Sequence, residues 1–134
     1  MDLGLYTKSM ELLKRAMDAR ALRHRVLVSN IANLETPGFV PRAVRFQEEL
    51  QRQLAPGGRL VRTHPRHLGA GGIGGFAPRI VADPDPNPGN DGNAVNVDRE
   101  MARLAENTLM YNALAQILAR KFRGLKEAIQ EAGR

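Results

Sequence analysis

The distribution of proline and glycine is the feature that most constrains the fold of this 134-residue chain. All eight prolines lie between Pro37 and Pro88, and ten of the thirteen glycines lie between Gly38 and Gly92. Because both residues break helices, long helices are confined to the two ends of the chain. The sequence therefore predicts an N-terminal helix over residues 1–35, an excursion of turn, short helix and loop over residues 36–95, and a C-terminal helix over residues 96–134.

Both ends carry apolar residues at the alternating spacing of three and four that is typical of coiled-coil helices. Arg20 and His24 interrupt this repeat in the N-terminal helix, and we expect them to fix the register of pairing or to meet a neighbouring protein. In the C-terminal helix only Thr108 interrupts it. The repeat residues that we expect to pair the helices or to join subunits are Leu13, Met17, Leu27, Ile31, Leu34, Met101, Leu104, Tyr111, Leu118, Phe122, Leu125 and Ile129.

Two apolar helices of similar length, each about 45–55 Å long given the rise per residue, can pair if the middle brings the chain back. The sequence thus predicts a mainly α fold, in which the terminal helices form an antiparallel coiled coil and the proline- and glycine-rich middle is largely irregular. Asn96 is expected to cap the second helix, with Asp98 and Glu100 in its first turn, where the helix dipole favours acids.

A second apolar stripe runs beside each repeat, formed by Leu5, Leu12, Ala16, Ala19 and Val26 in the first helix and by Met110, Ala113, Leu114 and Ile117 in the second. A pair of helices alone cannot cover both stripes. The alternative is a three-helix bundle completed by residues 44–54, but that segment is too short to cover both helices. The sequence therefore favours self-association or contact with a partner.

Composition and charge exclude several classes of protein. The net charge of +6 is spread evenly, at +2 in each of residues 1–35, 36–96 and 97–134, whereas a nucleic-acid-binding surface concentrates its charge. We therefore expect no nucleic acid as partner. The chain has no cysteine, which excludes disulfides and thiolate metal sites. Its N-terminus does not resemble a cleaved secretory signal, and no stretch is apolar enough to span a membrane.

Three patterns in the sequence suggest ligand sites, but each lacks features that such a site requires. The segment GAGGIG at residues 69–74 fits a dinucleotide fingerprint but lacks the flanking strand and helix. A calcium loop beginning at Asp83 would place Pro88 where glycine is needed and Ala94 where glutamate is needed. His64 and His67 lack further zinc ligands. No nucleophile stands beside a base, so we expect no enzymatic activity, no metal and no cofactor.

The stretch SNIANLETPGF, residues 29–39, ends the first helix. Thr36 precedes a proline and is pushed out of helical conformation, so we expect the helix to end near residues 33–35. Pro37 and Gly38 suit the central positions of a type II turn. Asn30 and Asn33 are expected to bond freed carbonyls or the returning chain, and Phe39 to pack back on the helix end.

The string ANLETPGF, residues 32–39, resembles a signature near the N-terminus of bacterial flagellar rod and hook proteins. A second stretch, DGNAVNVDREMARLAENTLMY at residues 91–111, and KFRGLK at residues 121–126 are similar to the C-terminal region of the proximal-rod members. Residues 54–90 match no motif of the family. The positions that carry the resemblance are Asn30, Ala32, Asn33, Thr36, Pro37, Gly38, Phe39, Asp91, Gly92, Asn93, Val95, Asp98, Glu100 and Asn107.

The resemblance implies a structural subunit of the flagellar basal body, located in the periplasm and polymerising through its terminal helices into the rod that transmits torque from the MS ring to the hook. It implies export through the flagellar type III apparatus without a cleaved signal peptide. Implied partners are the chain itself, other rod subunits, the MS-ring region, the rod-base adaptor and the export gate. The alternatives are a basic helical adaptor, such as a secretion chaperone, or a nucleic-acid-binding protein.

Overall fold

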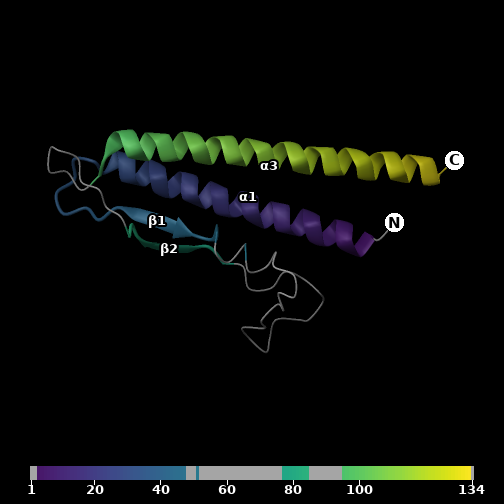
Figure 1. Ribbon diagram of the computed structural model, residues 1–134, viewed down its shortest axis with the longest axis horizontal. Helices are drawn as coiled ribbons and strands as arrows, with labels where there is room; N and C mark the ends of the chain where they lie inside the picture. The colour runs from purple at the N-terminus through teal and green to yellow at the C-terminus, as the bar shows by residue number, and fades with distance from the viewer. Residues whose placement is uncertain (1–2, 48–50, 52–76, 85–94, 134) are drawn as a thin grey trace, which may run out of the picture.

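A computed structural model of the chain describes residues 3–47, 51, 77–84 and 95–133. Its elements are helix α1 (Leu3–Ala32), strand β1 (Arg42–Arg45), strand β2 (Arg79–Ala82) and helix α3 (Val97–Ala132), as Figure 1 shows. The predicted mainly α fold with two long, paired terminal helices is confirmed. His64, His67, the glycine-rich segment 69–74 and the motif residues Asp91, Gly92 and Asn93 lie outside the described residues.

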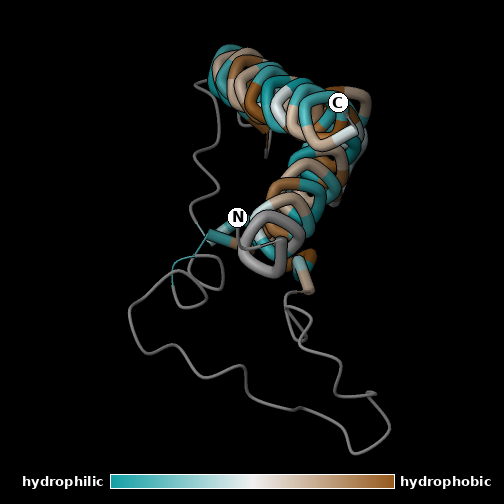
Figure 2. The backbone as a smooth tube through the Cα atoms, turned by 90° about the vertical axis from the view of Figure 1, so that its right-hand side faces the viewer, coloured by the Kyte–Doolittle hydropathy of each residue, from teal (hydrophilic) through white to brown (hydrophobic). Residues whose placement is uncertain are grey.

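Helix α1 lies between α3 and the strands (Figure 1). The two helices run antiparallel, so the N-terminus and the C-terminus lie at the same end of the pair. They are closest near the end of α1 and the start of α3, and they separate toward the termini (Figures 1 and 2). We call the region around the end of α1 and the start of α3 the closed end of the pair.

The two strands form an antiparallel sheet that the sequence did not predict. Arg42 pairs with Ala82 and Arg45 with Arg79. Each strand has only four residues inside a segment rich in proline and glycine, so no alternating pattern long enough to indicate a strand is present. Because Val44 belongs to β1, a third helix beginning at residue 44 is wrong.

The hydrophobic core lies between α1 and β1. Val44 and Phe46 pack with Ala19 and Val26, and Leu22 lies against this cluster. Ala16 is buried as well. The second apolar stripe of α1, for which the sequence required additional protein, is therefore covered in part by the chain's own β1 segment.

The end of α1 lies close to the predicted position, and the turn after it has the predicted form. The helix ends at Ala32, one residue earlier than expected, and Asn33 donates from Nδ2 to the carbonyl of Ser29 at 2.8 Å. The amide of Phe39 donates to the carbonyl of Thr36 at 3.2 Å, and Gly38 has a φ of 73°. A positive φ at this position matches the type II turn that Pro37 and Gly38 predict. Phe39 is half-buried.

The predicted start of α3 is also confirmed. Asn96 has extended backbone angles, and its Oδ1 accepts a hydrogen bond from the amide of Arg99 at 3.2 Å. Asp98 and Glu100 occupy the first turn. Asn96 therefore satisfies one of the amides that a helix N-terminus leaves without a partner.

Candidate functional site: the interface of the two helices

Asn30 joins three elements at the closed end. Its Nδ2 donates to the carbonyl of Arg42 in β1 at 2.9 Å and to Oε2 of Glu100 in α3 at 2.8 Å, and its Oδ1 accepts from the amide of Arg42 at 3.0 Å. The side chain is 0% exposed. A side-chain amide has two donor hydrogens and an acceptor oxygen, so Asn30 can bind the backbone N–H and C=O of Arg42 and the carboxylate of Glu100 at the same time. Asn30 therefore fixes α1, β1 and α3 against one another.

Arg103 extends this network to the second strand. Its Nη1 donates to Oδ2 of Asp83, which follows β2, at 2.6 Å and to Oε1 of Glu100 at 2.8 Å. The amide of Asp83 in turn donates to the carbonyl of Pro41 at 2.8 Å. Burial acts to lower the pKa of Arg103, but the hydrogen bonds and charges of Asp83 and Glu100 outweigh it and raise the pKa. Arg103 therefore stays charged and holds the sheet to α3.

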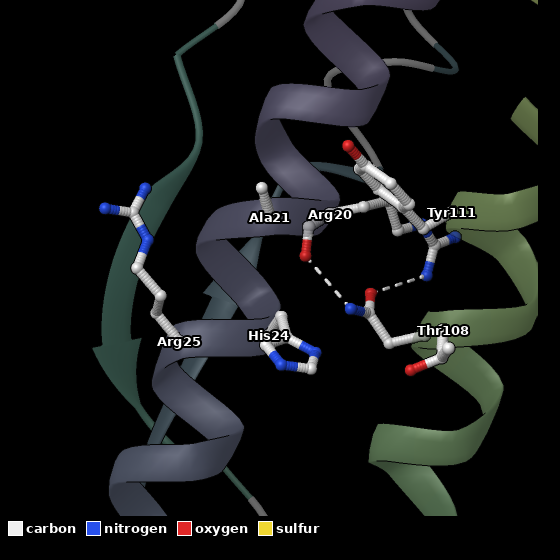
Figure 3. A pocket seen from close by; sticks show the side chains of 7 residues that line it. Arg20, Ala21, His24, Arg25, Thr108 and Tyr111 are labelled. Atoms are coloured by element: carbon white, nitrogen blue, oxygen red, sulfur yellow. Dashed lines mark hydrogen bonds between the residues drawn. The ribbon is translucent and has the colours of Figure 1, made fainter. Parts of the chain in front are cut away.

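Asn107 makes a second polar contact between the helices, one that Figure 3 shows. Its Nδ2 donates to the carbonyl of Arg20 at 2.9 Å, and Nη1 of Arg20 lies 3.5 Å from its Oδ1. The guanidinium of Arg20 also lies over the ring of Phe46, 5.1 Å from the centroid. Burial, followed by repulsion from Arg23, lowers the pKa of Arg20. Asn107 and Asn30 are the largest fully buried side chains of the described residues.

An open groove of about 390 Å³ lies beside this contact. Ala21, His24 and Arg25 line it from α1, and Thr108 and Tyr111 from α3 (Figure 3). His24, Thr108 and Tyr111 are exposed. Of the two residues that interrupt the N-terminal repeat, Arg20 thus lies inside the interface and His24 at its open edge.

Comparison with characterised proteins identifies the family. The chain is 38% identical over 116 residues to the flagellar basal body rod protein FlgB of Cereibacter sphaeroides, covering 87% of this chain and 89% of that protein. It is 31% identical over 129 residues to FlgB of Bacillus subtilis, covering 95% and 97%, and 30% identical over 123 residues to FlgB of Salmonella typhimurium, covering 87% and 89%. The chain belongs to the FlgB family.

Membership of the FlgB family confirms the resemblance to flagellar rod proteins. No protein-family model matches the chain. The relatives give no support to a nucleic-acid-binding protein or an adaptor. Within the described residues, no helix is long and apolar enough to cross a membrane, and no group of acidic, histidine or cysteine side chains has the arrangement of a metal site.

The predicted repeat residues fall into two sets in this FlgB-family chain. Leu27 is buried, and seven residues are half-buried: Leu13, Met17, Ile31, Leu34, Leu104, Leu118 and Leu125. Four residues of α3 are exposed instead: Met101, Tyr111, Phe122 and Ile129. Because the sequence analysis expects these residues either to pair the helices or to join subunits, the four that are exposed in the single chain are available only for contact with other subunits. The residues Glu100 and Asn107, each one position earlier than Met101 and Thr108, are the ones that α1 buries.

The residues that carry the family resemblance also fall into a buried set and an exposed set. Asn30, Val95, Glu100 and Asn107 are buried, whereas Ala32, Thr36, Pro37, Gly38 and Asp98 are exposed. The sequence did not predict that Glu100 and Asn107 contact α1. Their spacing of seven residues is the signal that could have found them, because it equals the heptad of a coiled coil.

The outer faces of α3 carry an apolar surface that the described residues leave uncovered. The exposed large apolar side chains of this helix are Met101, Leu109, Met110, Tyr111, Ile117, Phe122 and Ile129. Leu109 is 68% exposed and Ile129 64%. Apolar surface of this extent on a helix is typical of a site that contacts other proteins.

Proposed function

We propose that the chain is a non-enzymatic structural subunit of the proximal rod of the bacterial flagellum. In this role it polymerises through its terminal helices and helps to form the shaft that transmits torque from the MS ring to the hook. The observation that carries the proposal is the uncovered apolar surface of α3 in a chain whose closed end is held together by its own polar contacts. The FlgB family supplies the context for that surface.

The mechanism of assembly is burial of α3 against neighbouring subunits. Each Å² of apolar surface removed from water contributes about 25 cal/mol, so several large side chains together supply a substantial driving force. Contacts between different faces of successive copies are heterologous, and they propagate a helical tube instead of closing a dimer. The coiled-coil domain, residues 1–35 with residues 96–134, would form the wall of this tube, with β1 packed against α1.

The proposed location and partners follow from the same role. The subunit would reach the periplasm through the flagellar type III export apparatus and assemble at the base of the rod. There it would contact other rod subunits, the MS-ring region, the rod-base adaptor and the export gate. The motif residues that set the path of the chain in this proposal are the turn residues Thr36, Pro37 and Gly38, with Asn30 anchoring the returning strand.

The test is a charge placed on the exposed face of α3. Phe122 is 54% exposed, so Phe122→Asp leaves the fold of the single chain intact while it puts a carboxylate where a neighbour would pack. In a bacterium that lacks its own rod subunit, we expect wild-type chain to restore swimming and Phe122→Asp to abolish it while the subunit is still exported. Swimming and export are scored by motility in soft agar and by immunoblotting of the exported fraction.

The matched control is Gln116→Asp, which places the same carboxylate at an exposed polar position of the same helix. We expect this variant to swim. Normal swimming of the Phe122→Asp strain would contradict assembly through this face, and failure of the wild-type chain to enter purified basal bodies would contradict the rod function itself.

A further inference from the structure

One heptad position of α3 faces α1 and is mostly polar. Every seventh residue from Glu100 is buried or half-buried, and the series is Glu100, Asn107, Leu114, Lys121 and Ala128. Three of these five residues are polar, although this is the side of the helix that α1 covers. Apolar residues normally occupy such positions, because burial of apolar surface stabilises helix pairs.

Each polar member of the series meets a polar group of α1. Oε2 of Glu100 accepts from Asn30 at 2.8 Å, Nδ2 of Asn107 donates to the carbonyl of Arg20 at 2.9 Å, and Nζ of Lys121 donates to Oγ of Ser9 at 3.0 Å.

The partners on α1 follow in reverse order along the chain, as antiparallel helices require. Between Arg20 and Ser9 the covered residues of α1 include the apolar Leu13 and Ala16. Leu114 holds the corresponding place on α3, between Asn107 and Lys121. The two helices therefore carry matching series that read polar, polar, apolar, polar.

We propose that this series sets the register in which α1 and α3 pair. Buried polar contacts add little net stability compared with apolar packing, but they can specify one arrangement among several of similar stability. A slip of α3 by one heptad would move it about 10 Å along α1 and would preserve the apolar packing repeat. The polar series is what distinguishes the slipped arrangements from the observed one.

Both directions of slip mismatch the series. If α3 moves so that Asn107 faces Asn30, Leu114 comes opposite Arg20 and Lys121 comes opposite the apolar stretch of Leu13 and Ala16. If α3 moves the other way, Asn107 faces that apolar stretch and Leu114 faces Ser9. Leaving a buried polar group without a partner is unfavourable, so each mismatch disfavours the slipped pairing. The single apolar position distinguishes the observed register from the slipped ones, because in a uniformly polar series polar groups would still face polar groups after a slip.

The experiment measures the register directly in the purified full chain. The chain has no cysteine, so Asp18→Cys and Gln130→Cys place two spin labels at exposed positions at different heights on the pair. Pulsed electron paramagnetic resonance then gives the distribution of distances between the labels. We expect one narrow maximum for the labelled wild-type sequence, because one register is populated.

The test variant is Arg20→Met with Asn107→Leu, which removes the polar side chains of both residues, while the carbonyl of Arg20 remains, and places an apolar side chain over Phe46. We expect helix content by circular dichroism to be retained and a second maximum to appear, displaced by about 10 Å. The second test variant, Ser9→Ala with Lys121→Met, removes a different contact of the series and is expected to act in the same way. The matched control is Arg25→Met with Asn112→Leu, which makes the same two kinds of substitution at exposed positions of the same helices. We expect this control to keep one maximum.

A single unchanged maximum in both test variants would overturn the inference, as would several maxima in the wild-type sequence. Loss of helix in both test variants would also overturn it, because these contacts would then supply stability and not register. The measurement concerns one chain in solution, so its failure leaves the proposed rod function untouched. The swimming and basal-body assays decide that function separately.

Discussion

The first third of α3 and the rest of the helix differ in what they bury. In residues 97–108 the buried side chains are Glu100 and Asn107, which are 3% and 2% exposed. In residues 109–132 no described side chain is buried, and large apolar side chains such as Leu109 and Phe122 are more than half exposed. The helix thus buries polar groups at one end and exposes apolar ones at the other.

This difference separates two tasks along one helix. The first third contacts α1 and, through Arg103, the residue after β2, so its geometry is fixed within the single chain by hydrogen bonds that require particular partners. Within the part of the chain that the structure describes, the rest of the helix lies beside α1, and its exposed apolar side chains are available to any partner that offers a complementary surface. In α3, polar contacts therefore fix the position of the helix on α1, and apolar surface is left over for association.

The largest expected effect on stability is a difference between two leucine-to-alanine substitutions, one at a buried position and one at an exposed position. Leu27 is 4% exposed and Leu109 is 68% exposed. Leu27→Ala removes buried methyl groups and leaves a cavity, so we expect it to lower the free energy of unfolding by about 2–4 kcal/mol. Leu109→Ala should change it by less than about 0.5 kcal/mol, because the side chain is already in water. Urea unfolding followed by circular dichroism at low protein concentration measures both values.

Equal losses of stability in these two alanine variants would contradict the contrast between the buried and the exposed side chains. A large loss at Leu109 that disappears on dilution would instead mean that its surface is already covered by another copy in solution. Sedimentation at the same concentrations distinguishes that case.

An intermediate effect is expected at the turn that follows α1. Gly38 has a φ of 73°, and a Cβ built there meets no atom within 4 Å, so only the backbone conformation opposes a side chain. We expect Gly38→Ala to lower the free energy of unfolding by about 1–2 kcal/mol, the usual penalty for a left-handed residue. Gly38→Asn should cost less, because asparagine tolerates this conformation. Thermal unfolding of the two variants tests this, and an Ala variant as stable as the wild type would show that the turn does not restrain the closed end.

The smallest effect is a gain in stability in the sheet. Arg45 and Arg79 lie directly opposite each other in the register of β1 and β2, and both are exposed. Like charges in such a pair repel, so Arg79→Glu should raise the free energy of unfolding by about 0.2–1 kcal/mol. Added salt should reduce the gain, because it screens exposed charges. Arg79→Gln serves as control and should give a smaller gain, and a loss of stability in the Glu variant would contradict the predicted repulsion.

The sequence predicted the long helices and their boundaries because local rules govern them. Pro37 and Gly38 dictate a turn whatever surrounds them, and Asn96 caps the helix that follows it through its own side chain. The apolar repeat likewise predicted that the two ends would pair. These features depend on residues within a few positions of one another, so a single chain is enough to reveal them.

The sheet and the polar contacts depend on residues that are distant in sequence, and local patterns do not encode those pairings. β1 and β2 are four residues each and carry arginine at three of their four ends, which hides them among loop residues. Glu100 and Asn107 look like surface residues until α1 is placed beside them. The repeat therefore did not reveal that Glu100, next to Met101, is the residue that contacts α1.

The start of α1 and the end of α3 lie at the same end of the helix pair, and this arrangement bears on the response to force (Figure 1). A pull on the termini loads the contacts in succession, beginning near Lys121 and Ser9, so the helices unzip one contact at a time under a small tension. A load along the axis that pushes one helix past the other shears every contact simultaneously and meets far greater resistance. We therefore expect the pair to resist a load along its axis better than a pull that parts its two ends.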